Sequence, residues 1–177
     1  MKKILLLFTA LGALTLSSCN NDDDNVAVVD GGTDTIAEVF EVNNVNFAPD
    51  VDGNYQITVP LDPVIFGNDV VLVYRLTGSD PQGNDVWSLT PNFVYNNFGE
   101  VRYTSDFSLN SVAIYLDSDY LITQTPALLQ NQVFRIVIVP GSTNGQAKAA
   151  KVDFKDYTAV IKHYGINDSN VKTLNVK

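Results

Sequence analysis

The chain has 177 residues, of which 45% are hydrophobic, and its formal net charge is -9. This acidic balance argues against nucleic-acid binding, because contacts to phosphates need a basic stripe. A single cysteine and a single histidine argue against an intrachain disulfide and against His- and Cys-rich zinc sites.

Residues 1–18 have the features of a secretory signal peptide. Lys2 and Lys3 give a basic start, and an uncharged apolar run of 13 residues follows at 4–16. A membrane-spanning helix needs about 20 residues. The segment is therefore predicted to be a cleaved signal rather than an anchor.

The end of this segment, Leu16-Ser17-Ser18-Cys19, resembles the lipobox of bacterial lipoproteins. The resemblance implies that a diacylglyceryl group is attached to the sulfur of Cys19 and that the signal is cut just before it. Two or three acyl chains are enough for stable membrane anchoring.

An acidic run that contains Asp22, Asp23 and Asp24 follows Cys19 directly. It resembles the export signal that sends lipoproteins of the Bacteroidota to the outer face of the outer membrane. A solvated spacer has the same composition, so the periplasmic face of the outer membrane remains the alternative location.

Residues 19–35 are rich in Asn, Asp, Gly and Thr and are predicted to form a flexible tether. Asp34-Thr35-Ile36 matches a short pattern that Bacteroidota glycosylate on secreted proteins, which makes Thr35 a candidate O-glycosylation site. Residues 36–177 remain as a single folded domain.

The pattern from residue 38 onward is that of successive strands rich in β-branched and aromatic residues. Alternation at 55–59 predicts a strand with one wet face, whereas continuous apolar runs at 70–76 and 133–139 predict strands covered on both faces. The expected strands are 39–42, 55–59, 70–76, 86–87, 101–104, 112–116 and 133–139.

Turn residues separate these strands. Asp52-Gly53 predicts a hairpin, the segment 80–84 joins two strands, and Asn97-Phe98-Gly99 precedes another. Many short strands spaced by turns predict a mainly β protein, an antiparallel β-sandwich that is immunoglobulin-like or jelly-roll-like.

The C-terminal part predicts one helix at 156–165 and a short strand at 171–176. Asp156 can cap the start of the helix and Gly165 its end. Tyr157, Val160, Ile161 and Tyr164 form one apolar stripe, so the helix is expected to cover one face of a sheet.

Several of these segments resemble, in order, a group of small lipoproteins from flavobacteria and related Bacteroidota. They are Val39-Phe40-Glu41-Val42, residues 69–75, Asp85-Val86-Trp87, residues 132–140 and residues 156–162. The group has no established activity. The resemblance therefore implies the localisation and a single domain, and it transfers no site residue.

Catalytic signatures are missing from the sequence. His163 is expected to be an exposed or partly covered helix residue, and neither a Gly-x-Ser-x-Gly elbow nor a dinucleotide fingerprint is present. Glycoside hydrolysis needs only two carboxylates, yet no acidic pair stands out. We therefore expect no enzyme and no cofactor, with an acid-only glycoside hydrolase as the alternative.

Asp50, Asp52 and Asn54 are a weak candidate for a calcium loop. In an EF-hand the glycine stands at position 6 and a glutamate at position 12, but here Gly53 is at position 4 and Leu61 at position 12. An EF-hand is excluded. A looser single-ion site and a plain hairpin turn both remain open.

Arg75 and Arg135 each interrupt a very apolar strand. A charge in such a strand lies on a wet face or is paired. We expect structural ion pairs with an acid at a strand end, such as Asp69 or Asp117. The alternative is an arginine that grips a ligand in a groove.

Trp87, Tyr95, Phe98 and Tyr103 gather around the predicted hairpins. Such rings either fill the core of the sandwich or present a platform for sugars. Trp87, Tyr95 and Tyr103 are the candidate glycan-binding residues, with Trp87 the best of them because it closely follows a turn.

The sequence thus predicts a lipid-anchored envelope protein without catalytic activity, whose domain binds a glycan, another envelope protein or a host molecule, or has a structural role. Its membrane contact is expected to be the lipid on Cys19.

Overall fold

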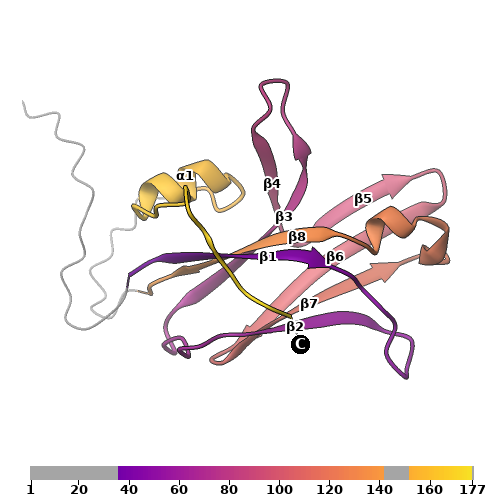
Figure 1. The fold of residues 1–177 in the computed structure, drawn as a ribbon, viewed down its shortest axis with the longest axis horizontal. Coiled ribbons are helices and arrows are strands. Elements are labelled where there is room, and N and C mark those ends of the chain that lie inside the picture. Colours follow the sequence, from indigo (N-terminus) through magenta and orange to yellow (C-terminus); the bar gives the residue numbers. More distant parts are fainter. Residues whose placement is uncertain (1–35, 142–151, 177) are drawn as a thin grey trace, which may run out of the picture.

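The computed structural model describes residues 36–141 and 152–176. Two β-sheets pack face to face in this part of the chain, with one α-helix on the outside (Figure 1). The predicted mainly β class, an antiparallel sandwich with one C-terminal helix, is confirmed. The strands are β1 (Glu38–Val45), β2 (Tyr55–Pro60), β3 (Val70–Ser79), β4 (Asp85–Leu89), β5 (Asn92–Asn96), β6 (Gly99–Ser108), β7 (Ser111–Ser118), β8 (Gln132–Val139) and β9 (Lys172–Thr173).

Sheet A has the strand order β4-β3-β8-β1-β9, and sheet B has the order β2-β7-β6-β5. The pairs are nested, since β1 lies beside β8 and β2 beside β7. All neighbours are antiparallel except β1 and β9, which are parallel. In the immunoglobulin order the first two strands are neighbours. Here they lie in different sheets, so the order is nearer to a jelly roll.

The two continuous apolar strands, β3 and β8, are buried on both faces as predicted. Val71, Val73 and Ile136 face sheet B and belong to the core between the sheets. Leu72 and Tyr74 point the opposite way and pack under α1. Sheet B has a wet outer face, because β2 and β7 alternate between buried and partly exposed residues.

Helix α1 (Tyr157–His163) begins and ends where the sequence predicts. The Asp156 carboxylate accepts a hydrogen bond from the Ala159 N–H at 2.9 Å. At the other end Gly165 has a φ of 62°, and the Ile166 N–H donates to the Ile161 carbonyl at 3.0 Å. This 6→1 bond is the Schellman closure, which favours glycine at that position.

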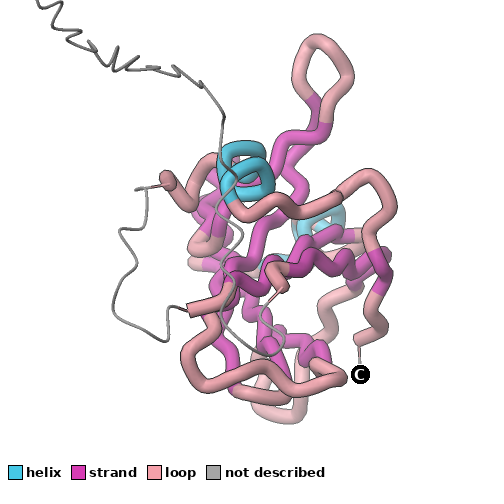
Figure 2. Tube along the Cα trace, turned by 90° about the vertical axis from the view of Figure 1, so that its left-hand side faces the viewer, coloured by secondary structure: helices cyan, strands magenta, loops and turns pink. Residues whose placement is uncertain are grey.

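Helix α1 lies outside the strands of the sandwich (Figure 2), and its apolar stripe packs on the outer face of sheet A. Tyr157, Val160 and Ile161 are buried. Burial of such a side chain contributes roughly 1.5–3 kcal/mol, which is enough to hold two turns of helix that would be marginal alone. Two short 3-10 helices, η1 (Ile122–Gln124) and η2 (Pro126–Leu128), connect β7 to β8.

The segment around Asp52-Gly53 forms the predicted hairpin turn, closed by an antiparallel Pro49–Tyr55 bridge, and it also carries the chain from β1 in sheet A to β2 in sheet B. Two other details of the predicted elements are wrong. Strand β5 was not expected. The expected strand at 171–176 is only the two residues of β9.

Cys19, Asp22, Asp23, Asp24 and Thr35 lie outside the described residues, as does the signal peptide. The lipobox, the export signal and the glycosylation site therefore stay predictions. Within the described ranges, no helix has the length and apolar character needed to cross a membrane.

Candidate functional site

A polar groove lies between the tip of the β3–β4 hairpin and α1. Its volume is about 390 Å³. The lining comes from the hairpin, from β8, from the start of α1 and from the segment after it. The lining residues are Gly83, Asn84, Asp85, Trp87, Arg135, Tyr157, Thr158 and Asp168. Three separate stretches of chain thus build one surface.

Arg135 is the most highly bonded of these residues. Its Nε lies 3.0 Å from Glu41 Oε2, and its Nη1 lies 3.2 Å from Asp168 Oδ2. Nη1 also donates to the hydroxyl oxygen of Tyr157 at 2.6 Å, and that hydroxyl donates to Asp168 at 2.9 Å. An ion pair was predicted for Arg135 with an acid such as Asp69 or Asp117, and one forms, but its acids are Glu41 and Asp168.

Nε and Nη1 of this guanidinium have hydrogen-bond partners, whereas its third nitrogen, Nη2, has none among the described residues. Nη2 is also not a fully buried atom. Nη2 is therefore accessible and keeps donors for a bound molecule. The bonds to Nε and Nη1 hold the guanidinium of Arg135 in one orientation, and its Nη2 side is left free to bind a ligand.

The aromatic wall of the groove is Trp87. The guanidinium carbon of Arg135 lies 4.3 Å from the centre of its ring, and the ring of Tyr157 lies 5.7 Å away. A guanidinium over an indole face is a favourable cation–π arrangement. The ring is therefore held in place by two neighbours before any ligand arrives.

Burial and bonding act in opposite directions on the ionisation of this cluster. Burial lowers the pKa of Arg135, but its hydrogen bonds to Glu41 and Tyr157 outweigh that effect and leave the pKa raised. Burial raises the pKa of Tyr157. The positive charge of Arg135 lowers this pKa, and the hydrogen bond to Asp168 raises it further. Arg135 stays charged and Tyr157 stays protonated at neutral pH.

The register of sheet A explains how these side chains meet. Glu41 of β1 and Tyr74 of β3 are the direct neighbours of Arg135 on either side of β8. Tyr74 and Tyr157 meet edge to face with centres 5.2 Å apart, and the Tyr74 hydroxyl donates to the Phe154 carbonyl at 2.7 Å. The segment that leads into α1 is thereby fixed to the sheet.

Arg75 lies in a different environment, on the inner face of sheet A. Its guanidinium donates to Gln132 Oε1 from Nε at 2.9 Å and from Nη2 at 2.7 Å, and to Asn92 Oδ1 from Nη1 at 3.2 Å. It lies 4.2 Å from the centre of the Tyr103 ring. Arg75 itself is 7% exposed, and burial lowers its pKa.

The predicted ion pair of Arg75 with Asp69 or Asp117 is wrong. Asp69 precedes the other end of β3, six residues away, which is about 20 Å along a strand. Asp117 faces solvent and pairs with Arg102 at 3.8 Å. Amide oxygens replace the carboxylate, so among the described residues the buried charge of Arg75 is solvated without a counterion.

The candidate aromatic residues do not form one platform. Tyr103 is 0% exposed and fills the core, so the expectation that it binds a glycan is wrong. Tyr95 is 73% exposed but belongs to sheet B. Phe98 stacks on Tyr120 with centres 5.8 Å apart. Trp87 alone of the four lies in the groove.

The calcium candidate is a closed turn. Asp50 Oδ1 accepts from the backbone N–H groups of Asp52 at 2.9 Å and Asn54 at 2.8 Å. Asp80 in the loop between β3 and β4 makes the same two bonds, to Gln82 and Asn84. The shared pattern Asp-x-x-Gly-Asn, with the glycine at a φ of 86° or 87°, is a type I turn with a bulge.

Hydrogen bonds from their own loops lower the pKa of both carboxyls, Asp50 and Asp80. Each carboxylate therefore has a structural role in its turn. His163 is exposed, and its ring meets Tyr164 edge to face at 4.8 Å. Among the described residues no group of three His, Cys, Asp or Glu side chains is placed to hold a metal ion.

Comparison with protein-family models, with characterised proteins and with solved structures found no match to this chain. The resemblance to flavobacterial lipoproteins therefore stays a prediction from the sequence.

The three residues that bond to Arg135, namely Glu41, Tyr157 and Asp168, were not singled out as site residues by the sequence. Tyr157 was assigned to the apolar stripe of the helix, and its hydroxyl has a second use as the link between Arg135 and Asp168. Glu41 lies between Phe40 and Val42 in β1, and it points to the face of sheet A that α1 covers. A charged residue at this position makes that face partly polar. Asp168 carries no local signal.

Proposed function

We propose that this chain is a lipid-anchored protein of the bacterial cell envelope whose domain binds a glycan, without catalysis, in the groove between the β3–β4 hairpin and α1. The observation that supports it most directly is the open side of Arg135. Its accessible Nη2 donors lie beside the Trp87 ring and among carboxylate, amide and hydroxyl groups.

This combination suits a hydroxyl-rich ligand. The carboxylates of Asp85 and Asp168 accept hydrogen bonds from sugar hydroxyls, while Asn84 and Arg135 donate to them. An aromatic ring provides apolar surface for the carbon-bound hydrogens of a sugar. Small-molecule sites usually combine such a wall with a few fixed polar groups. Because the charge of Arg135 is already met by Glu41 and Asp168, we expect a neutral glycan.

The binding claim is tested with the full mature protein on a glycan array, followed by titration with the best glycan. The protein has one tryptophan, so fluorescence of Trp87 reports occupancy of the groove directly. We expect a fluorescence change that saturates. Binding with no change in Trp87 emission would place the ligand elsewhere and contradict the proposal.

Two exposed residues of the lining give the cleanest variants. Asp85→Ala and Thr158→Ala remove groups from the groove without touching the Arg135 cluster, and each should weaken binding by about fivefold, since a hydrogen bond contributes about 1 kcal/mol. Tyr95→Ala on sheet B is the matched control. Trp87→Ala is less informative, because Trp87 also packs on Arg135 and Tyr157.

The anchoring claim rests on the lipobox and is tested separately. Radiolabelled palmitate should be incorporated into the wild-type protein and not into Cys19→Ala, which should leave the membrane fraction. Protease treatment of intact cells should degrade the wild type, and replacement of Asp22, Asp23 and Asp24 by alanine should protect it. Full protection of the wild type would move the protein to the periplasmic face.

The alternative is an acid-only glycoside hydrolase, and the lining of the groove by Asp85 and Asp168 is the observation behind it. Such enzymes place two carboxyl groups on either side of the scissile bond. Asp168 is engaged by Arg135 and Tyr157, which favours binding. Turnover on a glycan panel that is abolished by Asp85→Asn or Asp168→Asn would decide for the enzyme.

A further inference from the structure

The sandwich is open along part of one flank. Strand β4 pairs with β3 only from Tyr74 onward, and β5 pairs with β6 only as far as Tyr103. The chain crosses from sheet A to sheet B at Thr90, whose N–H donates to the Val73 carbonyl at 2.9 Å and whose hydroxyl lies 2.7 Å from that of Ser105. Beyond this crossing neither sheet has a further strand among the described residues.

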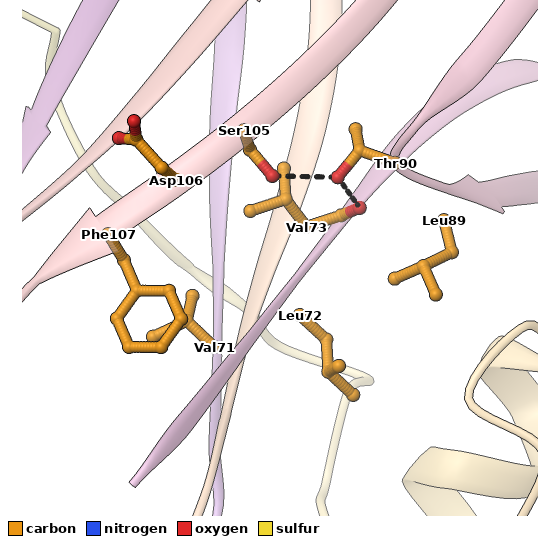
Figure 3. A pocket seen from close by; sticks show the side chains of 8 residues that line it. All are labelled: Val71, Leu72, Val73, Leu89, Thr90, Ser105, Asp106 and Phe107. Carbon is orange, nitrogen blue, oxygen red and sulfur yellow. Dashed lines mark hydrogen bonds between the residues drawn. The ribbon is translucent and has the colours of Figure 1, made fainter.

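A hollow of about 390 Å³ occupies this opening. It is lined by Val71, Leu72, Val73, Leu89, Thr90, Ser105, Asp106 and Phe107 (Figure 3).

Among the described residues, backbone groups on both sides of the opening have no strand partner. In an antiparallel ladder the N–H and C=O of one residue point to the same side, and successive residues alternate. The Val73 carbonyl meets Thr90 on the flank, so the backbone of Val71 also points there. On β6 the same alternation, continued from the pair Asn96–Gly99 at the β5–β6 turn, points the backbone of Ser105 and Phe107 to the flank.

The side chains at the opening are apolar on the inside. Phe107 has the same orientation as Val101 and Tyr103, which are fully buried, yet it is 46% exposed. Figure 3 shows its ring beside Val71, at the mouth of the hollow. An inward-facing phenylalanine that remains half exposed indicates that this flank has room for one more strand, which would bury the ring.

The acidic residues near the opening indicate which kind of chain can bind there. Asp106 lines its rim from the outer face of sheet B, where its carboxylate accepts a hydrogen bond from the Tyr115 hydroxyl at 3.0 Å, and Asp69 stands just before the free part of β3 with a buried Oδ1 atom that has no hydrogen-bond partner among the described residues. Neither carboxylate has a cationic partner within the described ranges. A second copy of this chain, whose net charge is -9, is a poor complement to them, and an extended segment with lysine or arginine is a good one.

We propose that this flank binds an extended, cationic segment of another protein by strand addition. Strand addition uses main-chain hydrogen bonds for affinity and alternate side chains for specificity. The backbone of the segment bonds to Val71 on β3 or to Ser105 and Phe107 on β6. Its apolar side chains cover Phe107, and its basic side chains meet Asp69 and Asp106.

The test uses the full mature protein and two synthetic peptides, acetyl-Lys-Val-Thr-Val-Thr-Val-Lys-amide and its counterpart with glutamate in place of both lysines. Amide hydrogen exchange is followed by NMR at millimolar peptide. The lysine peptide should slow exchange at Val71 or at Ser105 and Phe107 by at least tenfold, and the glutamate peptide should not. No protection by either peptide, or equal protection by both, overturns the proposal.

Ser105→Pro provides the matched variant. Proline removes an N–H that faces the flank and breaks no bond to β7, but it also removes the Ser105 hydroxyl that bonds to Thr90. The thermal midpoint should therefore fall only slightly while peptide protection is lost. Tyr95→Ala, on the outer face of sheet B, should leave protection unchanged. Protection that is already present without peptide, and that disappears on dilution or on replacement of residues 26–29 by Gly and Ser, would assign the flank to a second copy or to this chain's own tether and overturn the proposal.

Discussion

Arg75 of β3 and Arg135 of β8 lie on neighbouring strands of sheet A and point to opposite faces of it. In the ladder between these strands Arg135 is paired with Tyr74, and Arg75 is paired with Phe134, one residue along. On the outer face, the neighbouring strand β1 brings Glu41 to Arg135 and the segment after α1 brings Asp168, and one side of its guanidinium stays open. On the inner face Arg75 meets the amide of Gln132 from the start of β8 in its own sheet, and the amide of Asn92 and the ring of Tyr103 from sheet B.

The difference shows that the same residue type in the same kind of strand has two roles. A buried guanidinium without a counterion depends on every hydrogen bond that it makes. Arg75 therefore fixes the packing of Gln132 and the η2 segment against the sheets. Arg135 is partly solvated and pairs with acids, so a ligand can exchange with water at its open side.

The largest effect is expected at Gln132, the main partner of Arg75. Gln132→Leu removes both bonds from Arg75 to Oε1 and leaves the carbonyls of Ala127 and Gln130 without their donor. We expect the free energy of unfolding to fall by about 3 kcal/mol, measured by urea denaturation. The double variant Arg75→Met with Gln132→Leu is the control and should recover part of the loss. A loss below about 1 kcal/mol for Gln132→Leu would show that the buried charge is not held by Gln132.

A smaller effect is expected at Tyr157, which links Arg135 to Asp168. Tyr157→Phe keeps the ring over Trp87 and removes only the hydroxyl, while Arg135 and Asp168 remain 3.2 Å apart. The free energy of unfolding should fall by about 1 kcal/mol. Glycan affinity should fall as well, because Asp168 is less firmly oriented. Calorimetric titration measures the second effect, and unchanged affinity would separate the cluster from the groove's function.

Alkaline pH separates the two environments further. Burial raises the pKa of Tyr103 to about 12, partly offset by Arg75. The unfolded chain loses this proton near pH 10, so the stability from burying neutral Tyr103 is present below pH 10 and is lost as pH rises toward 12. The thermal midpoint should fall across that window, and Tyr103→Phe should flatten the fall. A fall that is equally steep in the variant would assign it to other tyrosines.

The smallest effect is expected at the exposed turns. The pKa values of Asp50 and Asp80 are lowered, first by the Asn54 backbone for Asp50 and by the Asn84 side chain for Asp80. Stability from each is present above about pH 4, the unfolded value, and is lost as pH falls below it. Asp80→Asn should reduce this acid sensitivity without changing the fold at neutral pH. Equal acid curves for wild type and variant would show that the turn closes without the charge.

Much of the architecture followed from local patterns. The continuous apolar runs of β3 and β8 predicted burial on both faces, and the stripe of α1 predicted the helix that provides one of the covers. Asp156 and Gly165 marked the ends of that helix because capping is a property of adjacent residues. The Asp-x-x-Gly-Asn turns likewise depend on five consecutive residues, so their chemistry could be read without the fold.

The partners of the two arginines were decided only by the tertiary structure. Gln132 and Asn92 reach Arg75, and Glu41 and Asp168 reach Arg135, across sequence separations from 17 to 94 residues. Strand order and register set those meetings, and no local pattern encodes either. The sequence by itself predicted most of the strands and both helix caps, because each depends on neighbouring residues, and the lipobox remains a prediction of the same local kind. The groove, the open flank and the exposure of each aromatic ring depend on which distant segments share a sheet, which only the packed molecule decides.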